Sequence, residues 1–354
     1  MRSRVCVLVV VSAAVLAAGC KKKKKAGGEP SASPTASASP SASATPEPTP
    51  SASAPAPDPA LVARGQYLAT AVAGCVGCHT PMGPQGPDMA KMFAGGMEFP
   101  EKWGTWRSPN ITQDKKTGIG DWSDEAIATV IREGKRPDGS MVIPMMPYMR
   151  YNAMSDDDVK AVVAFLRTLP AVENTVAGNK DLKLPPMPPM PKPAGTAPAA
   201  DPVEQGKYLA NLMLCADCHT PMTPDGMMPD MKNEWAGGME WDMWPPGMGT
   251  GKTVSANITS DKKTGIGEWA EADIVTLLTT GKKKDGTMVG PPMVIFVPLW
   301  SQLKPDDVAN VAKFIKSIPP IERKNPKSTF KPGGPPPGGA PPAGGPPPAE
   351  QPKG

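Results

Sequence analysis

The sequence predicts an all-α protein in which one small helical domain occurs twice. Residues 58–170 and 201–320 carry the same short motifs in the same order, which is the pattern of a tandem duplication. In both segments the apolar residues recur at the three- and four-residue spacing of amphipathic helices. A strand–helix–strand pattern, which would indicate a parallel sheet, is missing from both.

The first segment, residues 58–170, shows three helix patterns. Asp58 and Pro59 are typical of a helix start, because Asp caps free amide groups and Pro fits the first helical position. Ser123 is placed to cap a second helix, and Gly134 follows its end. A last helix opens at Ser155, and its apolar residues follow the i, i+3, i+4, i+7 spacing: Val159, Val162, Val163 and Leu166.

The second segment, residues 201–320, repeats these features. Asp201-Pro202 repeats the helix start, and Asn257-Ile258-Thr259 repeats Asn110-Ile111-Thr112. Trp269 matches Trp122. We therefore expect two copies of one domain, joined by a linker over residues 171–200.

A five-residue motif lies near the start of each copy: Cys75-Val76-Gly77-Cys78-His79 and Cys215-Ala216-Asp217-Cys218-His219. C-x-x-C-H is the attachment pattern of a c-type haem. Two thiols three residues apart lie on one side of a helical turn, where each can form a thioether with a haem vinyl group. The adjacent imidazole then becomes the proximal iron ligand. The sequence predicts two covalently bound haem c groups.

Two other interpretations of the cysteines deserve comparison. A lone C-x-x-C can be a thioredoxin-like redox pair, but that motif belongs beside a strand–helix–strand unit. Two C-x-x-C pairs can together bind one structural zinc ion. Neither accounts for the His that follows both pairs, nor for the Thr-Pro-Met that follows each His.

The sixth iron ligand is the next question, because the chain has only two His and both are in the motifs. A Met, another side chain or nothing must occupy that position. Aligning the copies on a shared Asp-Gly pair places Met146 opposite Met293, each in a Pro-stiffened loop before the last helix. These two are the predicted ligands, with Met141, Met145 and Met288 as alternatives.

Four further residues have two possible roles. Asn110 and Asn257 can bond haem propionates or shape turns, and Trp122 and Trp269 can bond a propionate or serve as core aromatics.

The N-terminal region predicts export and attachment to a membrane. Residues 1–20 have a basic start and an apolar run that is shorter than the ~20 residues of a membrane span. The run ends in Leu16-Ala17-Ala18-Gly19-Cys20, which resembles a bacterial lipobox with its Leu displaced by one position. We expect lipidation of Cys20, on the periplasmic side of a bacterial membrane.

Low-complexity segments surround the repeats. Residues 21–57 predict a disordered tether, 171–200 a spacer, and 321–354 a disordered Pro/Gly-rich tail, since they lack the apolar content of a core. The formal net charge of +4 gives no basis for nucleic-acid binding.

Together these motifs resemble class I cytochrome c in tandem. More narrowly, the chain resembles the cytochrome c subunits of bacterial membrane-associated alcohol, gluconate and aldehyde dehydrogenases. The motifs that carry the resemblance are Gly-x-Tyr-Leu-Ala before each C-x-x-C-H-T, Asn-Ile-Thr, Thr-Gly-Ile-Gly-x-Trp, and Met146-Pro147-Tyr148. Those subunits usually carry three haems, whereas this chain has two motifs, and Val294-Ile295 replaces Pro-Tyr after Met293.

The resemblance implies a periplasmic electron carrier, not an enzyme. The expected partners are redox proteins: a dehydrogenase subunit, a quinone-linked complex, or a terminal oxidase or reductase. The alternative is a dihaem enzyme of the peroxidase type, which needs one iron open to its substrate. A redox or gas sensor is the third possibility, although no output domain is visible.

Overall fold

The structure is a computed structural model that describes residues 57–83, 86–101, 104–178, 190–226, 228–242 and 249–333. We call residues 57–178 the first half and residues 201–333 the second half. The predicted signal peptide with Cys20, nearly all of the tether, and the tail beyond residue 333 lie outside the described residues. Among those described, no helix is both long and apolar enough to cross a membrane.

The first half is built from helices whose starts follow the predicted caps. The Asp58 carboxylate accepts a hydrogen bond from the Ala60 amide, and Ser123 and Ser155 cap their helices in the same way. The elements are α1 (Pro59–Tyr67), the π-helical turn η1 (Leu68–Val72), α2 (Cys75–His79), η2 (Met89–Lys91), α3 (Asp124–Glu133), α4 (Tyr148–Tyr151) and α5 (Asp156–Thr168).

The second half repeats this order with small changes. Helix α6 runs from Pro202 to Leu212 without the π-helical turn, and Asp201 caps it. The remaining helices are α7 (Cys215–His219), η3 (Met231–Asn233), α8 (Glu271–Thr280), α9 (Met293–Trp300) and α10 (Pro305–Ser317).

Short antiparallel strand pairs, which the sequence did not predict, connect the helices. They are β1 (Met82–Gly83) with β2 (Gly86–Pro87), β3 (Glu98–Glu101) with β4 (Gly104–Arg107), β5 (Glu240–Trp241) with β7 (Thr253–Val254), and β6 (Gly249–Thr250) with β8 (Lys331–Pro332). The first two pairs are hairpins, whereas β6 pairs with β8 from the far end of the second half. All of these strands are short, so the fold remains mainly helical.

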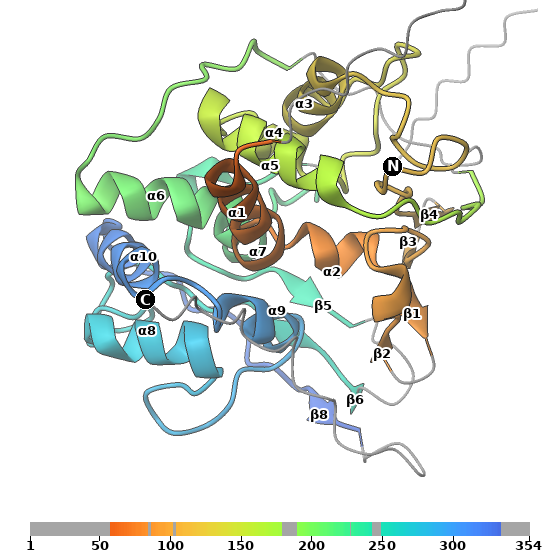
Figure 1. The fold of residues 1–354 in the computed structure, drawn as a ribbon. Coiled ribbons are helices and arrows are strands. Elements are labelled where there is room, and N and C mark those ends of the chain that lie inside the picture. Colours follow the sequence, from red (N-terminus) through yellow and green to blue (C-terminus); the bar gives the residue numbers. More distant parts are fainter. Residues whose placement is uncertain are drawn as a thin grey trace, which may run out of the picture. The chain divides into compact units, whose positions relative to one another are not determined.

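The core of each half lies where its first and last helices cross (Figure 1). A glycine allows the close approach: a Cβ on Gly65 would lie 1.8 Å from the Ala161 carbonyl oxygen of α5. At the matching place in the second half, a Cβ on Gly206 would lie 1.9 Å from the Asn310 carbonyl oxygen of α10. The buried apolar stripe of α5, from Val159 to Leu166, packs into this crossing as predicted.

Two predicted boundaries need correction. Residues 171–178, expected in the spacer, belong to the first half, because the Asn174 side chain donates to the Ala94 carbonyl at 2.8 Å. Residues 321–333, expected in the disordered tail, belong to the second half: Asn325 donates to the Ala236 carbonyl at 2.8 Å, and β8 pairs with β6. Hydrogen bonds, rather than apolar burial, hold these segments.

The two halves contact each other through equivalent elements. Helix α4 of the first half packs on α6 of the second, and α9 of the second packs on η1 of the first. The Tyr67 hydroxyl donates to Asp307 at 2.6 Å, and the Tyr208 hydroxyl donates to Asp158 at 2.8 Å. Both tyrosines and both aspartates occupy matching positions in the repeats, so the contact is reciprocal, like the interface of a two-fold dimer.

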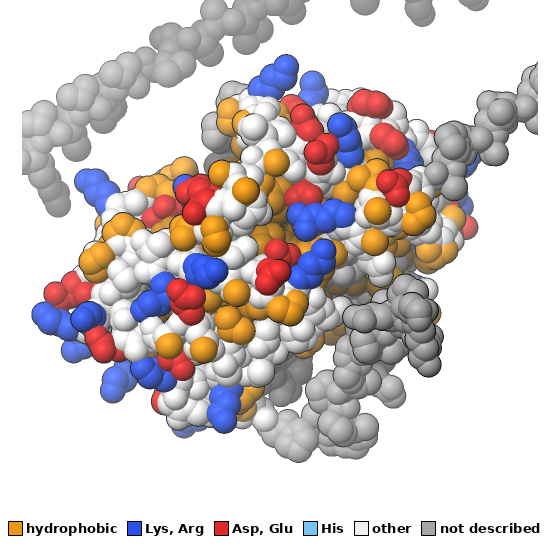
Figure 2. All heavy atoms as spheres, turned by 60° about the vertical axis from the view of Figure 1, so that its left-hand side comes forward, with side chains coloured by type: hydrophobic (Ala, Val, Ile, Leu, Met, Phe, Trp, Pro, Cys, Tyr) orange, Lys and Arg blue, Asp and Glu red, His pale blue; other side chains and the backbone are white. Residues whose placement is uncertain are grey.

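The surface carries charges of both signs. On the face in Figure 2, acidic and basic side chains alternate with small groups of hydrophobic atoms, and neither sign dominates. This distribution agrees with the modest net charge of the chain.

Candidate functional site

Each C-x-x-C-H motif forms a single helical turn, α2 in the first half and α7 in the second. A residue in the left-handed conformation precedes each turn, Gly74 at φ 63° and Leu214 at φ 62°. None of the four motif cysteines forms a disulfide. Burial raises the pKa of Cys75 and of Cys215 to about 12, because apolar surroundings disfavour a charged sulfur there.

The motif histidines are oriented by backbone carbonyls. His79 Nδ1 lies 2.8 Å from the Pro109 oxygen, and His219 Nδ1 lies 2.8 Å from the Ala256 oxygen. A carbonyl can only accept, so Nδ1 carries the proton and Nε2 keeps its lone pair. Burial lowers the pKa of both imidazoles, which favours this neutral form. A neutral imidazole fixed through its other nitrogen is the usual form of a histidine ligand to a metal.

Asn110 and Asn257 hold the loops that supply those carbonyls. Asn110 Nδ2 donates to the Thr117 hydroxyl at 3.0 Å and to the Val172 carbonyl at 2.7 Å, and its Oδ1 accepts from Thr112. Asn257 makes the matching set of bonds. All of their hydrogen-bonding groups are used within the protein, which favours the turn role over the propionate role. Trp122 and Trp269 are half-buried against the core, as core aromatics would be.

Among the described residues, four buried side-chain donors have no hydrogen-bond partner: Trp106 Nε1, Arg132 Nε, the Tyr148 hydroxyl and Thr253 Oγ1. Two of them, on Trp106 and Thr253, occupy matching places in the repeats, and the sequence did not single them out. Trp106 Nε1 and Thr253 Oγ1 have no partner, although their residues are only 5% and 6% exposed. Trp106 lies two residues before Ser108, and Thr253 lies two residues before Ser255. These two serines begin the equivalent loops of the two halves. A buried unpaired donor costs about 1–3 kcal/mol. A propionate oxygen would satisfy each donor, so these positions fit a haem in each half.

The candidate methionine ligands differ in burial from their alternatives. Met146 and Met293 are partly buried and pack against the core, whereas Met141, Met145 and Met288 are 43%, 38% and 56% exposed. Met146 comes just before α4, and Met293 is the first residue of α9. The choice of Met146 and Met293 as iron ligands stays a prediction.

The two thiol pairs lie on separate helices, α2 and α7. Over the described ranges, three or more His, Cys, Asp or Glu side chains nowhere gather in the manner of metal ligands. A single structural zinc would need all four thiols together.

The fold and the two motifs define a c-type cytochrome. The cytochrome c family model matches residues 62–170. A dihaem c-type cytochrome of Cereibacter sphaeroides is 30% identical over 285 residues, which cover 75% of this chain and 90% of that protein. The chain therefore belongs to the cytochrome c family.

Other relatives are subunits of dehydrogenases. The cytochrome c subunit of a quinone alcohol dehydrogenase from Gluconobacter oxydans is 32% identical over 76% of this chain. The cytochrome c subunit of gluconate 2-dehydrogenase from Pantoea cypripedii is 33% identical over 73% of it. The aligned part spans only 57% and 60% of those two proteins. The resemblance predicted from the sequence is confirmed.

Proposed function

We propose that this chain is an electron carrier with two covalently attached haem c groups, one in each half. Each half would then be one class I cytochrome c domain of a tandem pair. The observation that carries the proposal is the pair of C-x-x-C-H turns, each with its imidazole held through Nδ1 by a loop carbonyl. A bound haem supplies reversible one-electron reduction of its iron.

The residues of the chain have distinct tasks in this proposal. Cys75 and Cys78 hold the first haem by thioethers, and His79 is its proximal ligand. The second haem is held in the same way by Cys215, Cys218 and His219. Trp106 and Thr253 offer buried donors to propionates.

Met146 and Met293 would supply a thioether ligand to the first and the second haem iron. Ligation by one Met and one His would raise the reduction potential of a haem relative to ligation by two His, and the Met would exclude outside molecules from the iron. Both effects suit a carrier that exchanges single electrons. The partial burial of these two side chains supports the assignment.

We further propose that the protein works on the periplasmic side of a bacterial membrane, anchored by lipid on Cys20. It would receive electrons from a membrane-associated dehydrogenase or the quinone pool and pass them to a terminal acceptor. The similarity to dehydrogenase cytochrome subunits supports a dehydrogenase partner. Purification from gently solubilised membranes tests this: recovery of a dehydrogenase supports it, and recovery of an oxidase alone identifies a free-standing relay.

Reaction with carbon monoxide separates the carrier from a peroxidase-type enzyme. A carrier with two closed irons binds carbon monoxide slowly or not at all when reduced. Fast binding to one ferrous haem would favour the enzyme.

A further inference from the structure

The two attachment turns meet the opposite half at equivalent positions. In the first motif, a Cβ on Gly77 would lie 3.9 Å from Leu299 Cδ1 of helix α9. In the second motif, Asp217 Oδ1 lies 2.6 Å from Arg150 Nε of helix α4. One contact is apolar, and the other is an ion pair.

These contacts match residue for residue. Gly77 and Asp217 are each the third residue of their C-x-x-C-H motif. Leu299 directly precedes Trp300, and Arg150 directly precedes Tyr151, the buried aromatics at 6% and 3% exposure. The two repeats therefore differ at this matched contact, which lies beside the groups that would carry the haems.

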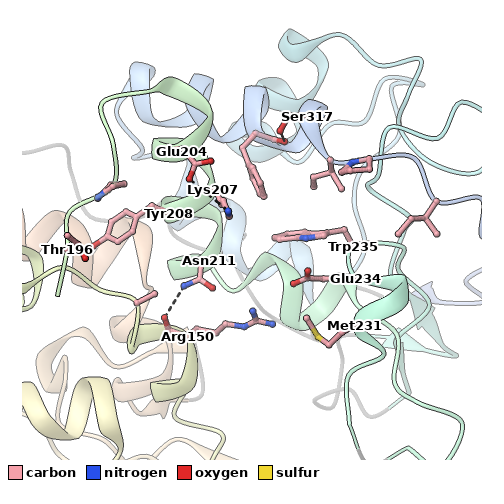
Figure 3. Close-up of a pocket in the computed structure, with 16 residues that line it drawn as sticks. Arg150, Thr196, Glu204, Lys207, Tyr208, Asn211, Met231, Glu234, Trp235 and Ser317 are labelled. Carbon is pink, nitrogen blue, oxygen red and sulfur yellow. Dashed lines mark hydrogen bonds and ion pairs between the residues drawn. The ribbon is translucent and has the colours of Figure 1, made fainter. Parts of the chain in front are cut away.

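The backbone of Arg150 is held by a further contact between the halves. The Asn211 side chain of α6 donates to the Arg150 carbonyl at 2.9 Å, and Figure 3 shows Arg150 extending below Asn211 toward Glu234. Its neighbour Tyr151 donates to the Ala73 carbonyl at 2.9 Å, two residues before Cys75. Successive residues of one short helix thus contact the two attachment regions.

The surroundings limit how strongly solvent weakens the pair. The Arg150 and Asp217 side chains are 23% and 39% exposed, so the charges are partly shielded. Arg150 borders a pocket of about 680 Å³ between the halves, which lets water reach one side. The interaction is therefore stronger than that of a free surface pair and weaker than that of a dry one.

We propose that Arg150 and Asp217 hold two compensating charges beside the second haem site, so that the loss of either one alone shifts the reduction of that haem. The pair places two opposite charges beside the second attachment turn, whereas Leu299 lies at the matching place beside the first turn. This inference rests on the proposed function, since it concerns the reduction of the two haems.

The proposal predicts opposite effects for the two single substitutions. Without Arg150, the remaining carboxylate stabilises oxidised iron, so reduction of the second haem becomes harder. Without Asp217, the remaining Arg150 guanidinium stabilises the reduced iron, so reduction of the second haem becomes easier. When both are replaced, the net charge is unchanged, and reduction returns close to its native position.

Spectroelectrochemical titration of the full haem-loaded chain measures both one-electron steps. We expect Arg150→Leu to lower the equilibrium constant for one reduction step by about tenfold, which corresponds to about 59 mV. Asp217→Gly should raise the equilibrium constant of the same step by a similar factor. The double variant, which copies the first half, should lie within about twofold of native. Gly77→Asp should lower the other step, which identifies it as the first haem.

Two further variants control for structural damage. Arg150→Lys keeps the charge and should leave both steps near native even if the other variants fold poorly. Lys160→Gln removes an exposed charge on α5 and should also move neither step. The inference is overturned if the single variants shift the potential of neither step, or if the double variant is shifted as far as either single variant. The carrier function would remain intact in both cases. A chain without covalent haem overturns both.

Discussion

Gly65 allows the sharpest test of the helix crossing. In an isolated helix, Ala in place of Gly stabilises by about 1 kcal/mol. Here the added Cβ would lie 1.8 Å from the Ala161 carbonyl oxygen and 2.4 Å from its carbon, both backbone atoms of α5 that cannot rotate away. Ordinary contact needs well over 3 Å, so α1 and α5 must move apart by more than an ångström.

Overpacking of this kind costs about 1–3 kcal/mol, and backbone contact places Gly65→Ala at the upper end. After the gain in helix propensity, we expect a net loss of about 2 kcal/mol, or roughly 5–10 °C in Tm. Urea and thermal unfolding followed by circular dichroism measure both quantities.

Two other glycines complete the experiment. Gly206→Ala should cost about as much, because its Cβ would lie 1.9 Å from the Asn310 oxygen. Gly290→Ala is the matched control, since the nearest atom to its Cβ would be Thr253 Cγ2 at 3.5 Å. A Gly65→Ala variant as stable as the native chain, or more stable, would refute the crossing as described.

Three further predictions concern single side chains. Asn110→Ala should lower the free energy of unfolding in urea by about 2–4 kcal/mol, because it removes the bond to the Val172 carbonyl and leaves buried partners unpaired. A loss below about 0.5 kcal/mol, which is the size of an ordinary surface substitution, would contradict this. Tyr67→Phe should cost about 1–2 kcal/mol by the same measurement, since the Asp307 carboxylate and a backbone amide lose their partner; unchanged stability would argue against the contact between the halves. Met146→Ala should abolish the thioether-to-iron charge-transfer band of one ferric haem and open its ferrous form to carbon monoxide; an unaltered spectrum would remove Met146 as a ligand.

Local features of the fold were predictable from the sequence. The caps at Asp58, Ser123 and Ser155 act within their own helices, so nearby residues suffice to predict them. The C-x-x-C-H turns are similarly local. The duplication also showed which helices correspond.

Long-range polar contacts were not predictable. Residues 321–333 have the composition of a tail, yet the Asn257 side chain, 64 residues earlier, binds the Ile321 carbonyl. The Tyr67–Asp307 bond joins residues 240 positions apart, and neither has a local signature.

The candidate site shows the same division. The cysteines and histidines were predicted from spacing alone, but Trp106 and Thr253 were not singled out. They occupy matching positions with different side chains, so the repeat gave no signal. Arg150 was missed for the same reason, because its counterpart is Leu299. Their roles depend on burial and on the other half, which only the folded structure supplies.

The central claim is that this one chain holds two covalent haems. The direct measurement is the intact mass of the chain produced in a host that attaches haem c, combined with a pyridine haemochrome spectrum. We predict a mass increase equal to two haems and a spectrum typical of two thioether bonds per haem. An increase of one haem, or haem that separates from the chain on denaturation, would contradict the account.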